Sequence, residues 1–470
     1  MINLEIPQVY ELYISSTGVC TDTRNIKEGC MFFALKGETF NGNNFAQSAL
    51  QQGAKYVVID DSTAYVNTES MILVNNVLVT LQQLARYYRL RYKIPVIALT
   101  GTNGKTTTKE LITAALSTKY NVVSTKGNLN NHIGVPLTLL SINSDTQIAV
   151  IEMGASSPGE IEALVKLVCP SFGLITNVGK AHLLGFGSFD GVKKTKGELY
   201  DNLVEYRKIA FVNTDNPHLV EMVRQRPTMQ IVPYGVKSNC VQIVTNKDDS
   251  PFLKIIIPNP CVMAVCENMN SEISKQIALE NGITQECCEP AQVEIDTHLI
   301  GDYNVDNVLA ALCVSTYFAV PTKNAIKAIE DYIPSNNRSQ ITKTEHNTLI
   351  VDTYNANPTS MRASLENFGK LNFKNKMLVL GDMLELGDDS ITEHIEIIKL
   401  AASLSPLRIF LVGEEFAKAY KTIGETKINI ELFNNSLLLH NRLAELKLNE
   451  TTVFIKGSHG IKLERIFDAL

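Results

Sequence analysis

Residues 96–108, with the sequence V-I-A-L-T-G-T-N-G-K-T-T-T, join an apolar run to a glycine turn and a lysine. The apolar run predicts a buried strand, and the threonines after the lysine begin a helix. A glycine turn between them builds a nest of backbone N–H groups at a helix N-terminus, where phosphate binds. We therefore expect a nucleoside triphosphate site formed by Gly101, Thr102, Asn103, Gly104, Lys105, Thr106 and Thr107.

The general phosphate-loop pattern has a glycine where this chain has Leu99, so the loop is a compact variant. The alternative is an ordinary helix start with an exposed lysine, but strand, turn and helix follow in the order that phosphate binding requires. In the functional interpretation, Lys105 neutralises the β and γ phosphates. The Thr106 hydroxyl then ligates Mg²⁺.

Composition sets the class of protein. A chain of 470 residues suggests about three domains. Its net charge of -6 argues against nucleic acid as a partner. Because there is no apolar run of roughly 18 residues and no basic leader, we expect no membrane span and a cytoplasmic location. Nine cysteines in so long a chain indicate reduced thiols rather than a disulfide framework. We expect a monomer.

The pattern of apolar runs predicts an α/β protein of three domains. Residues 1–92 alternate short strands, such as 31–35, with helices and form a small α/β domain. In residues 93–320 and again in 321–470, apolar runs end one after another at polar residues. Such runs, separated by helices, are typical of parallel sheets covered on both faces. We expect a central ATPase domain with a phosphate loop and a C-terminal, Rossmann-like, doubly wound domain.

Two strand ends supply candidate metal ligands. Glu152 follows the apolar run 148–151 and is placed to share a magnesium ion with Thr106, although a carboxylate here can also cap a helix. His182 lies in the loop after the run 172–176. An imidazole there can ligate a metal or orient a phosphate.

Lys196 differs from the other lysines of the helix expected over 191–200. Val192, Leu199 and Tyr200 lie at helical spacings that put Lys196 on the apolar side. A half-buried lysine has a lowered pKa and a nucleophilic neutral amine. Such an amine can take up carbon dioxide to form a carbamate, which we treat as a hypothesis.

Further polar residues stand at helix starts and strand ends. Asn304 and Asn307 precede a helix rich in alanine and leucine, where they can cap the helix or match the edge of adenine. In the third domain, carboxylate, cation and amide groups cluster at one sheet edge, where they can hold a small zwitterion. These residues are Asp352, Tyr354, Asn355, Asn357, Lys456 and Ser458.

With these motifs, nearly the whole chain resembles the Mur ligase family of ATP-dependent amide-forming enzymes. G-T-N-G-K-T-T is the phosphate loop of that family, which accounts for Leu99. The resemblance implies that Glu152 and His182 serve the metal sites, and that Lys105, His182 and a carbamylated Lys196 are catalytic. It also implies adenine contacts for Asn304 and Asn307 and a nucleotide contact for Arg338 in N-R-S-Q.

The resemblance also covers the substrate regions. It implies uridine-nucleotide contacts for Thr23 and Arg24 in T-D-T-R and for Lys36 in F-A-L-K-G, and muramoyl-substrate contacts for Asn128, Asn130 and Asn131. The stretch D-T-Y-N-A-N-P-T-S-M resembles the branch that adds D-alanyl-D-alanine. The chain departs from the family at His459, usually arginine, and at Asn41 and Asn43, where D-G-H is common.

The reaction that the resemblance implies uses ATP and Mg²⁺. ATP would phosphorylate the terminal carboxylate of UDP-N-acetylmuramoyl-tripeptide, and the amine of D-alanyl-D-alanine would attack the acyl phosphate to give a peptidoglycan precursor. We expect domain closure to gate this reaction. Three alternatives stay open: another amino-acid-adding Mur ligase, a folylpolyglutamate synthase, and a nucleotide-dependent binding module without catalysis. The third residue of the tripeptide, diaminopimelate or lysine, also stays open.

Overall fold

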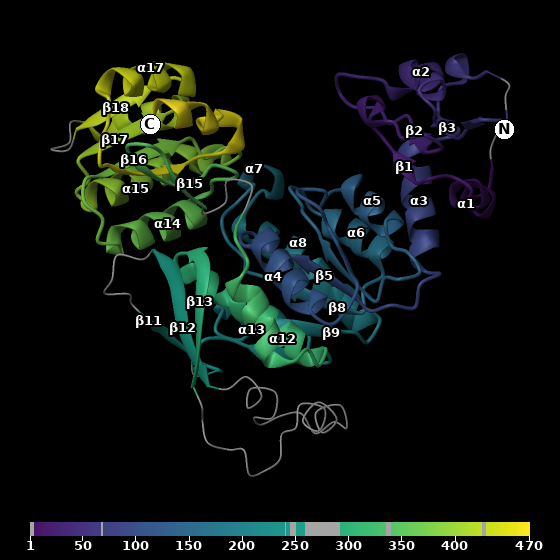
Figure 1. Cartoon of the computed structure of the whole chain (residues 1–470), viewed down its shortest axis with the longest axis horizontal. Coiled ribbons are helices and arrows are strands. Elements are labelled where there is room, and N and C mark those ends of the chain that lie inside the picture. The colour runs from purple at the N-terminus through teal and green to yellow at the C-terminus, as the bar shows by residue number, and fades with distance from the viewer. Residues whose placement is uncertain are drawn as a thin grey trace, which may run out of the picture.

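The computed structural model describes residues 4–66, 69–239, 241–244, 251–258, 292–334, 340–424 and 429–470. These residues form three α/β units in chain order, with a small antiparallel sheet between the second and third (Figure 1). The predicted three-domain α/β fold is confirmed. Within the described part of the chain, no helix is both long and apolar enough to cross a bilayer. The described cysteines are free thiols, namely Cys20, Cys30, Cys169 and Cys313.

The N-terminal unit is a four-stranded parallel sheet. Its strands, in spatial order, are β1 (Val19–Cys20), β2 (Met31–Phe33), β3 (Tyr56–Ile59) and β4 (Met71–Leu73). Its helices are α1 (Ile6–Ile14), α2 (Ala46–Gln51) and α3 (Val77–Arg89). The strand expected over 31–35 is shorter than predicted, because the chain turns after Phe33 and the Leu35 N–H donates to the Phe33 carbonyl (2.9 Å).

The central unit is a six-stranded parallel sheet with β5 inside it. In spatial order its strands are β10 (Gln230–Tyr234), β9 (Ile209–Asn213), β8 (Phe172–Ile175), β5 (Val96–Thr100), β7 (Ile148–Glu152) and β6 (Val122–Ser124). All five residues of β5 are buried, as its apolar sequence predicts. The chain passes from β5 to β6 and β7 on one side and then to β8 on the other. This reversal opens a crevice at the carboxyl end of β5.

Helices cover both faces of the central sheet. One face carries α4 (Lys105–Ser117), α12 (Val305–Tyr317) and α13 (Thr322–Glu330). The other carries α5 (Gly134–Leu140), α6 (Glu160–Val168), α8 (Phe189–Glu205) and α9 (Pro217–Arg224), with the short helix α7 (Leu183–Phe186) beside α8. The helix expected over 191–200 is longer at both ends, because the Ser188 side chain caps it and its apolar stripe continues to Leu203.

A three-stranded antiparallel sheet follows the central strands, and the sequence did not predict it. Its strands are β11 (Gln242–Val244), β12 (Phe252–Pro258) and β13 (Gln292–Ile300). Cys261, Cys266, Cys287 and Cys288 fall outside the described residues. Helix α13 lies beyond residue 320, the predicted end of the central domain. It nevertheless packs against α4 and buries Ala325, Ile326 and Ile329 in the core of the central unit.

The C-terminal unit is a six-stranded sheet that is parallel except for its first edge strand. In spatial order its strands are β14 (Gln340–Lys343), β15 (Thr348–Asp352), β19 (Thr452–Lys456), β16 (Lys376–Gly381), β17 (Arg408–Val412) and β18 (Ile430–Phe433). Its helices are α14 (Pro358–Lys370), α15 (Ser390–Ser403), α16 (Glu414–Ile423) and α17 (Ser436–Leu446). The polar ends of β15 and β19 lie side by side, as their sequences predict.

Candidate active site

The loop between β5 and α4 has the geometry of a phosphate loop. Gly101 has φ +148° and Gly104 has φ +75°, backbone conformations that disfavour side chains. A Cβ atom at Gly101 would lie 2.0 Å from Thr176 Oγ1, and one at Gly104 would lie 2.6 Å from Asn307 Oδ1. Both positions therefore require glycine. The Lys105 Nζ donates to the carbonyls of Gly101 (2.8 Å) and Thr102 (3.0 Å), so its ammonium lies over the loop.

The end of the neighbouring strand β8 fixes this loop. Asn177 accepts from the Asn103 backbone N–H (2.9 Å) and donates to the Asn103 carbonyl (3.0 Å). Thr176 also donates to that carbonyl (2.7 Å), and the Thr102 N–H donates to the Asn177 carbonyl (3.0 Å). Sequence reasoning did not assign Asn177 to the site. Its position directly after an apolar run, like that of Glu152, was the available signal.

Thr106 and Glu152, which are 46 residues apart, meet in the site. The Thr106 hydroxyl donates to Glu152 Oε2 (3.0 Å), and the Asn130 amide donates to Glu152 Oε1 (2.8 Å). The Glu152 side chain is buried, and both it and Thr106 line the cavity described below. A hydroxyl and one carboxylate beside a phosphate loop fit Mg²⁺, which takes few protein ligands and completes its shell with phosphate oxygens and water.

Asn307 packs against the phosphate loop from helix α12. Its Oδ1 accepts from the Thr108 hydroxyl (2.9 Å), and its Nδ2 donates to Asn304 Oδ1 (2.8 Å). Asn304 in turn donates to the Ile300 carbonyl (2.8 Å). Both asparagines are buried yet line the cavity, so the structure brings the predicted adenine contacts next to the phosphate loop. The predicted nucleotide contact Arg338 lies outside the described residues.

Lys196 is buried on helix α8, as its helical spacing predicts. Burial, together with the nearby Lys105 ammonium, lowers the pKa of Lys196 to about 7 against the opposing attraction of Glu160 and Glu198. The Lys196 Nζ lies 5.4 Å from the centroid of the Phe186 ring. Because a hydrophobic environment disfavours the charged amine, the neutral, nucleophilic form is accessible near neutral pH.

His182 begins helix α7 at a left-handed position (φ 50°) and lines the cavity. Its Nδ1 contacts the carboxylate of Glu385, a residue of the C-terminal unit. The Glu385 carbonyl also accepts from the Leu184 N–H (3.2 Å). A carboxylate on one ring nitrogen leaves the other nitrogen for a metal or phosphate. Among the described residues, no three His, Cys, Asp or Glu side chains cluster closely enough to hold a metal by themselves.

The ends of β15 and β19 supply charges from the C-terminal unit. The buried Lys456 ammonium pairs with the Asp352 carboxylate and donates to the Asn355 carbonyl (3.2 Å). Ser458 instead holds the neighbouring loop, because its Oγ accepts from the Leu384 N–H (3.1 Å). The side chain of Asn357 begins helix α14 by accepting from the Ser360 N–H (2.9 Å).

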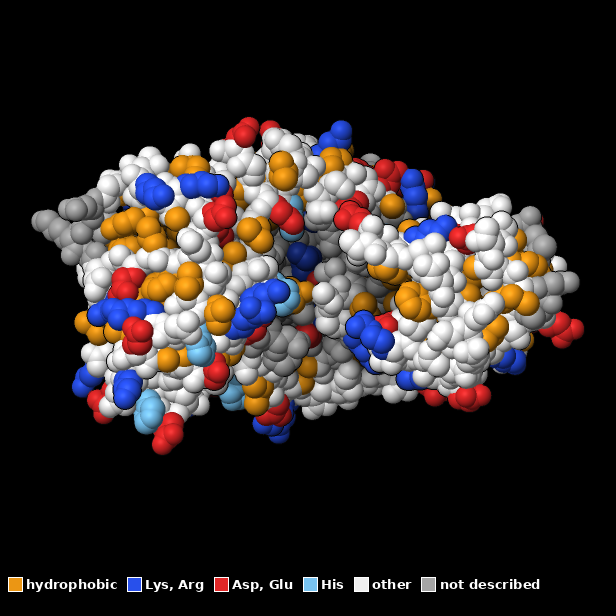
Figure 2. Space-filling view, turned by 90° about the horizontal axis from the view of Figure 1, so that it is seen from above, with side chains coloured by type: hydrophobic (Ala, Val, Ile, Leu, Met, Phe, Trp, Pro, Cys, Tyr) orange, Lys and Arg blue, Asp and Glu red, His pale blue; other side chains and the backbone are white. Residues whose placement is uncertain are grey.

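These groups surround one cavity of about 800 Å³ between the units. Figure 2 shows a hollow near the middle of the molecule, with basic, acidic and histidine side chains around it. The predicted site residues that line the cavity are Thr102, Asn103, Gly104, Lys105, Thr106, Thr107, Asn130, Asn131, Glu152, His182, Asn304, Asn307, Asp352, Tyr354, Asn355 and Lys456. Lining residues that sequence reasoning missed include Gln82, Asn177 and Tyr303.

Several predicted site residues do not line this cavity. They are Gly101, Asn128, Lys196, Asn357 and Ser458, and, in the N-terminal unit, Thr23, Arg24 and Lys36. Gly101 precedes Thr102 in the phosphate loop, the Asn128 carbonyl accepts from the Asn130 N–H (2.7 Å), and Asn357 bonds to Asn103. Lys196 is instead buried within α8, and the Ser458 hydroxyl holds the loop at Leu384. Arg24 is exposed, and its guanidinium pairs with the Asp22 carboxylate (Nη2 to Oδ2, 2.7 Å). This hydrogen bond lowers the pKa of Asp22 to about 2.

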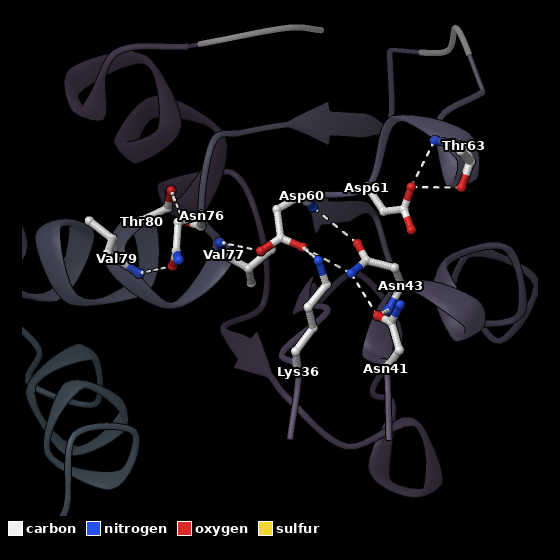
Figure 3. Close-up of polar contacts among 10 residues, drawn as sticks. All are labelled: Lys36, Asn41, Asn43, Asp60, Asp61, Thr63, Asn76, Val77, Val79 and Thr80. Atoms are coloured by element: carbon white, nitrogen blue, oxygen red, sulfur yellow. Dashed lines mark hydrogen bonds and ion pairs between the residues drawn. The ribbon is translucent and has the colours of Figure 1, made fainter. Parts of the chain in front are cut away.

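Lys36 belongs to a polar network at the end of β3, which Figure 3 shows. Its Nζ lies 2.9 Å from Asp60 Oδ1, and Asp60 Oδ2 accepts from the Val77 N–H at the start of α3 (3.1 Å). The buried Asn43 amide donates to Asp60 Oδ1 (2.9 Å) and to Asn41 Oδ1 (2.8 Å), and it accepts from the Asp60 N–H (3.0 Å). This network fixes the loop that carries Lys36.

Asn43→Ala is expected to destabilise the N-terminal unit by about 1–3 kcal/mol, because it removes a buried amide and leaves the part-buried Asp60 N–H and Asp60 carboxylate without that partner. Urea unfolding followed by circular dichroism measures this loss. Asn44→Ala, at the exposed neighbouring position, is the control and should change stability by less than about 0.5 kcal/mol. Equal stability of both variants would contradict the role of the Asn43 amide.

Three family models match consecutive parts of the chain. They are "Mur ligase family, catalytic domain" over residues 15–89, "Mur ligase middle domain" over 99–315 and "Mur ligase, glutamate ligase domain" over 337–459. The chain belongs to the Mur ligase family. The resemblance seen in its motifs is therefore confirmed.

Relatives and solved structures extend this result over the full chain. The UDP-N-acetylmuramoyl-tripeptide--D-alanyl-D-alanine ligase of Bacillus subtilis is 34% identical over 96% of this Mur ligase and 92% of the relative. The ligase of the same name from Escherichia coli is 32% identical over 97% of this chain and 94% of the relative. The crystal structure of MurF from Acinetobacter baumannii matches with a TM-score of 0.79, at 27% identity, over 97% of each chain.

Proposed function

We propose that this Mur ligase joins D-alanyl-D-alanine to UDP-N-acetylmuramoyl-tripeptide, with ATP converted to ADP and phosphate. The name shared by its relatives supports the substrates. The observation that carries the proposal is a cavity that is lined both by the phosphate loop of the central unit and by the charged strand ends of the C-terminal unit. A ligase that activates one substrate with ATP and couples it to another needs such a shared site.

The central unit would hold ATP. Backbone N–H groups of the phosphate loop other than those of Thr102 and Asn103, which donate to Asn177, would cradle the phosphates, with Lys105 balancing their charge. Asn304 and Asn307 line the same cavity, and in this proposal they contact the adenine. Thr106 and Glu152, with His182 nearby, would hold Mg²⁺, which neutralises charge on the transferring phosphoryl group.

The chemistry proceeds through two displacements. A terminal carboxylate oxygen of the tripeptide attacks the γ-phosphorus of ATP, and the bond from that phosphorus to the ADP oxygen breaks, giving an acyl phosphate and ADP. The dipeptide amine, after losing a proton, then attacks the acyl carbon, and phosphate leaves with the carbon–oxygen electron pair. Lys105 stabilises the negative charge that builds up in the first step.

The dipeptide would bind at the ends of β15 and β19. Its ammonium suits the Asp352 carboxylate and its carboxylate suits the Lys456 ammonium, two groups that pair with each other in the structure. Tyr354 and Asn355 line the same part of the cavity. In this proposal residues 321–470 recognise the dipeptide and residues 1–92 recognise the uridine nucleotide through Thr23, Arg24 and Lys36. Asn128, Asn130 and Asn131 would face the muramoyl peptide from residues 93–320.

Phosphate release with purified substrates tests the proposal. Release should require ATP, UDP-N-acetylmuramoyl-tripeptide and D-alanyl-D-alanine together, and mass spectrometry should detect the pentapeptide product. Parallel reactions should contain either diaminopimelate or lysine as the third residue of the tripeptide. Release with glutamate and a folate, but not with these substrates, would overturn the proposal in favour of a folylpolyglutamate synthase.

A further inference from the structure

A pair of asparagine side chains joins the phosphate loop to the C-terminal unit. The Asn357 Nδ2 donates to Asn103 Oδ1 (2.7 Å), although the two residues are 254 positions apart. The return contact from Asn103 Nδ2 to Asn357 Oδ1 is longer, at 3.5 Å. Asn357 is buried and Asn103 lines the cavity, so this hydrogen bond is partly buried at the wall of the site.

Each end of the pair is fixed by its own unit. The Asn103 backbone is held by Asn177 and Thr176, whereas its side chain contacts Asn357. The Asn357 Oδ1 must accept from the Ser360 N–H (2.9 Å) to cap α14, which turns its Nδ2 toward Asn103. A helix cap needs only the oxygen, and serine caps as well as asparagine does. The amide nitrogen of Asn357 is therefore free for a second role.

Asn357 also ends the loop that carries the proposed dipeptide contacts. This loop runs from Asp352 at the end of β15 to α14, and Asp352, Tyr354 and Asn355 line the cavity. Neighbouring contacts strengthen the same junction. The Lys180 Nζ pairs with Glu393 (2.5 Å), and the Lys180 N–H donates to the Thr359 hydroxyl (3.3 Å).

We propose that Asn357 is a positioning residue that ties the loop 352–357 to the phosphate loop through Asn103, so that dipeptide binding depends on the position of the nucleotide loop. The proposal rests on the proposed function, because it takes loop 352–357 as the dipeptide site. Without this link the loop 352–357 would lose its direct contact with the phosphate loop, and the Lys180 contacts to Glu393 and Thr359 would hold the junction only through helices α14 and α15.

Two single variants and their combination test the link. Asn357→Ser keeps a capping oxygen but is too short to reach Asn103, and Asn103→Ala keeps the backbone contacts of the phosphate loop. Each should raise the KM for D-alanyl-D-alanine about tenfold, which is the effect expected for the loss of this hydrogen bond. Asn357→Ser should leave the KM for ATP within about twofold. The double variant should show no further rise, because both changes break the same bond.

A matched control separates the loss of the Asn357–Asn103 hydrogen bond from the effect of changing a helix cap. Asn435 caps α17 in the same unit by accepting from the Leu438 N–H (3.0 Å) and does not line the cavity. Asn435→Ser should leave every KM unchanged, and melting temperatures of all variants report on folding. If Asn357→Ser does not fold, the KM of Asn103→Ala for D-alanyl-D-alanine tests the link by itself.

Three results would overturn the link. They are an unchanged KM for the dipeptide in Asn103→Ala, a rise in the KM for ATP alone, and effects that multiply in the double variant. Wild-type enzyme without dipeptide-dependent phosphate release would instead overturn the proposed function, so the two failures are distinguishable.

Discussion

Lys196→Ala is expected to lower kcat about a thousandfold while ATP still binds, because it removes the amine that we propose to be carbamylated for charge stabilisation and leaves the phosphate loop intact. In the family resemblance this lysine is carbamylated. Its neutral amine would bond to the carbon of carbon dioxide and release one proton, which gives a carboxylate on a longer stem. Stopped assays of phosphate release measure kcat, and titration calorimetry measures ATP binding.

A spectroscopic readout tests the carbamate itself. With ¹³C-labelled bicarbonate, the wild type should show a carbamate carbon signal in the NMR spectrum that Lys196→Ala lacks. Because burial and Lys105 lower the pKa of Lys196 to about 7, the amine loses its proton as the pH rises through that value, and the signal should grow in the same direction. The control is Lys194→Ala, at an exposed position of the same helix, which should retain both signal and activity. Near-normal turnover of Lys196→Ala would contradict the proposal that a carbamate on Lys196 takes part in catalysis.

Glu152→Gln is expected to lower kcat/KM about a hundredfold or more and to raise the Mg²⁺ concentration needed for half-maximal activity. Glutamine has nearly the same shape. Its oxygen in the place of Oε1 still accepts from the Asn130 amide, and its nitrogen in the place of Oε2 can donate to the Thr106 hydroxyl, so the fold should persist. What it lacks is the negative charge that a divalent cation requires. Activity titrations with Mg²⁺ measure both quantities.

The matched control for this charge is Glu162→Gln on the surface of α6, where the carboxylate pairs with Lys166 (2.5 Å) in water. An exposed pair of this kind contributes little, so activity and Mg²⁺ dependence should stay unchanged. If Glu152→Gln kept the wild-type Mg²⁺ dependence, Glu152 would be a structural carboxylate and the metal would lie elsewhere.

Strand ends predicted much of the candidate site. Each apolar run of the two large sheets is a strand, and parallel strands bring their carboxyl ends to one edge. This rule placed Glu152 beside Thr106 and Asp352 beside Lys456 without any knowledge of tertiary contacts. The same rule applied to Asn177 would have added it to the phosphate loop.

Contacts between units were beyond sequence reasoning. Asn357 was predicted from the sequence only as a substrate contact, and its bond to Asn103 exists because two sheets pack with their edges facing one cavity. The Glu385 contact to His182 has the same origin. Gln82 reaches the cavity from α3, a helix of the N-terminal unit with no motif of its own.

The sequence by itself determined the strand, turn and helix of the phosphate loop, the burial of Lys196 and the three-unit α/β fold, because these depend on spacings of a few residues along one strand or helix. Only the tertiary structure decided the partners of Asn103, the packing of α13 on α4 and the antiparallel sheet β11–β13. Those features depend on how segments far apart in the sequence pack together, and residue spacing along the chain does not predict that packing.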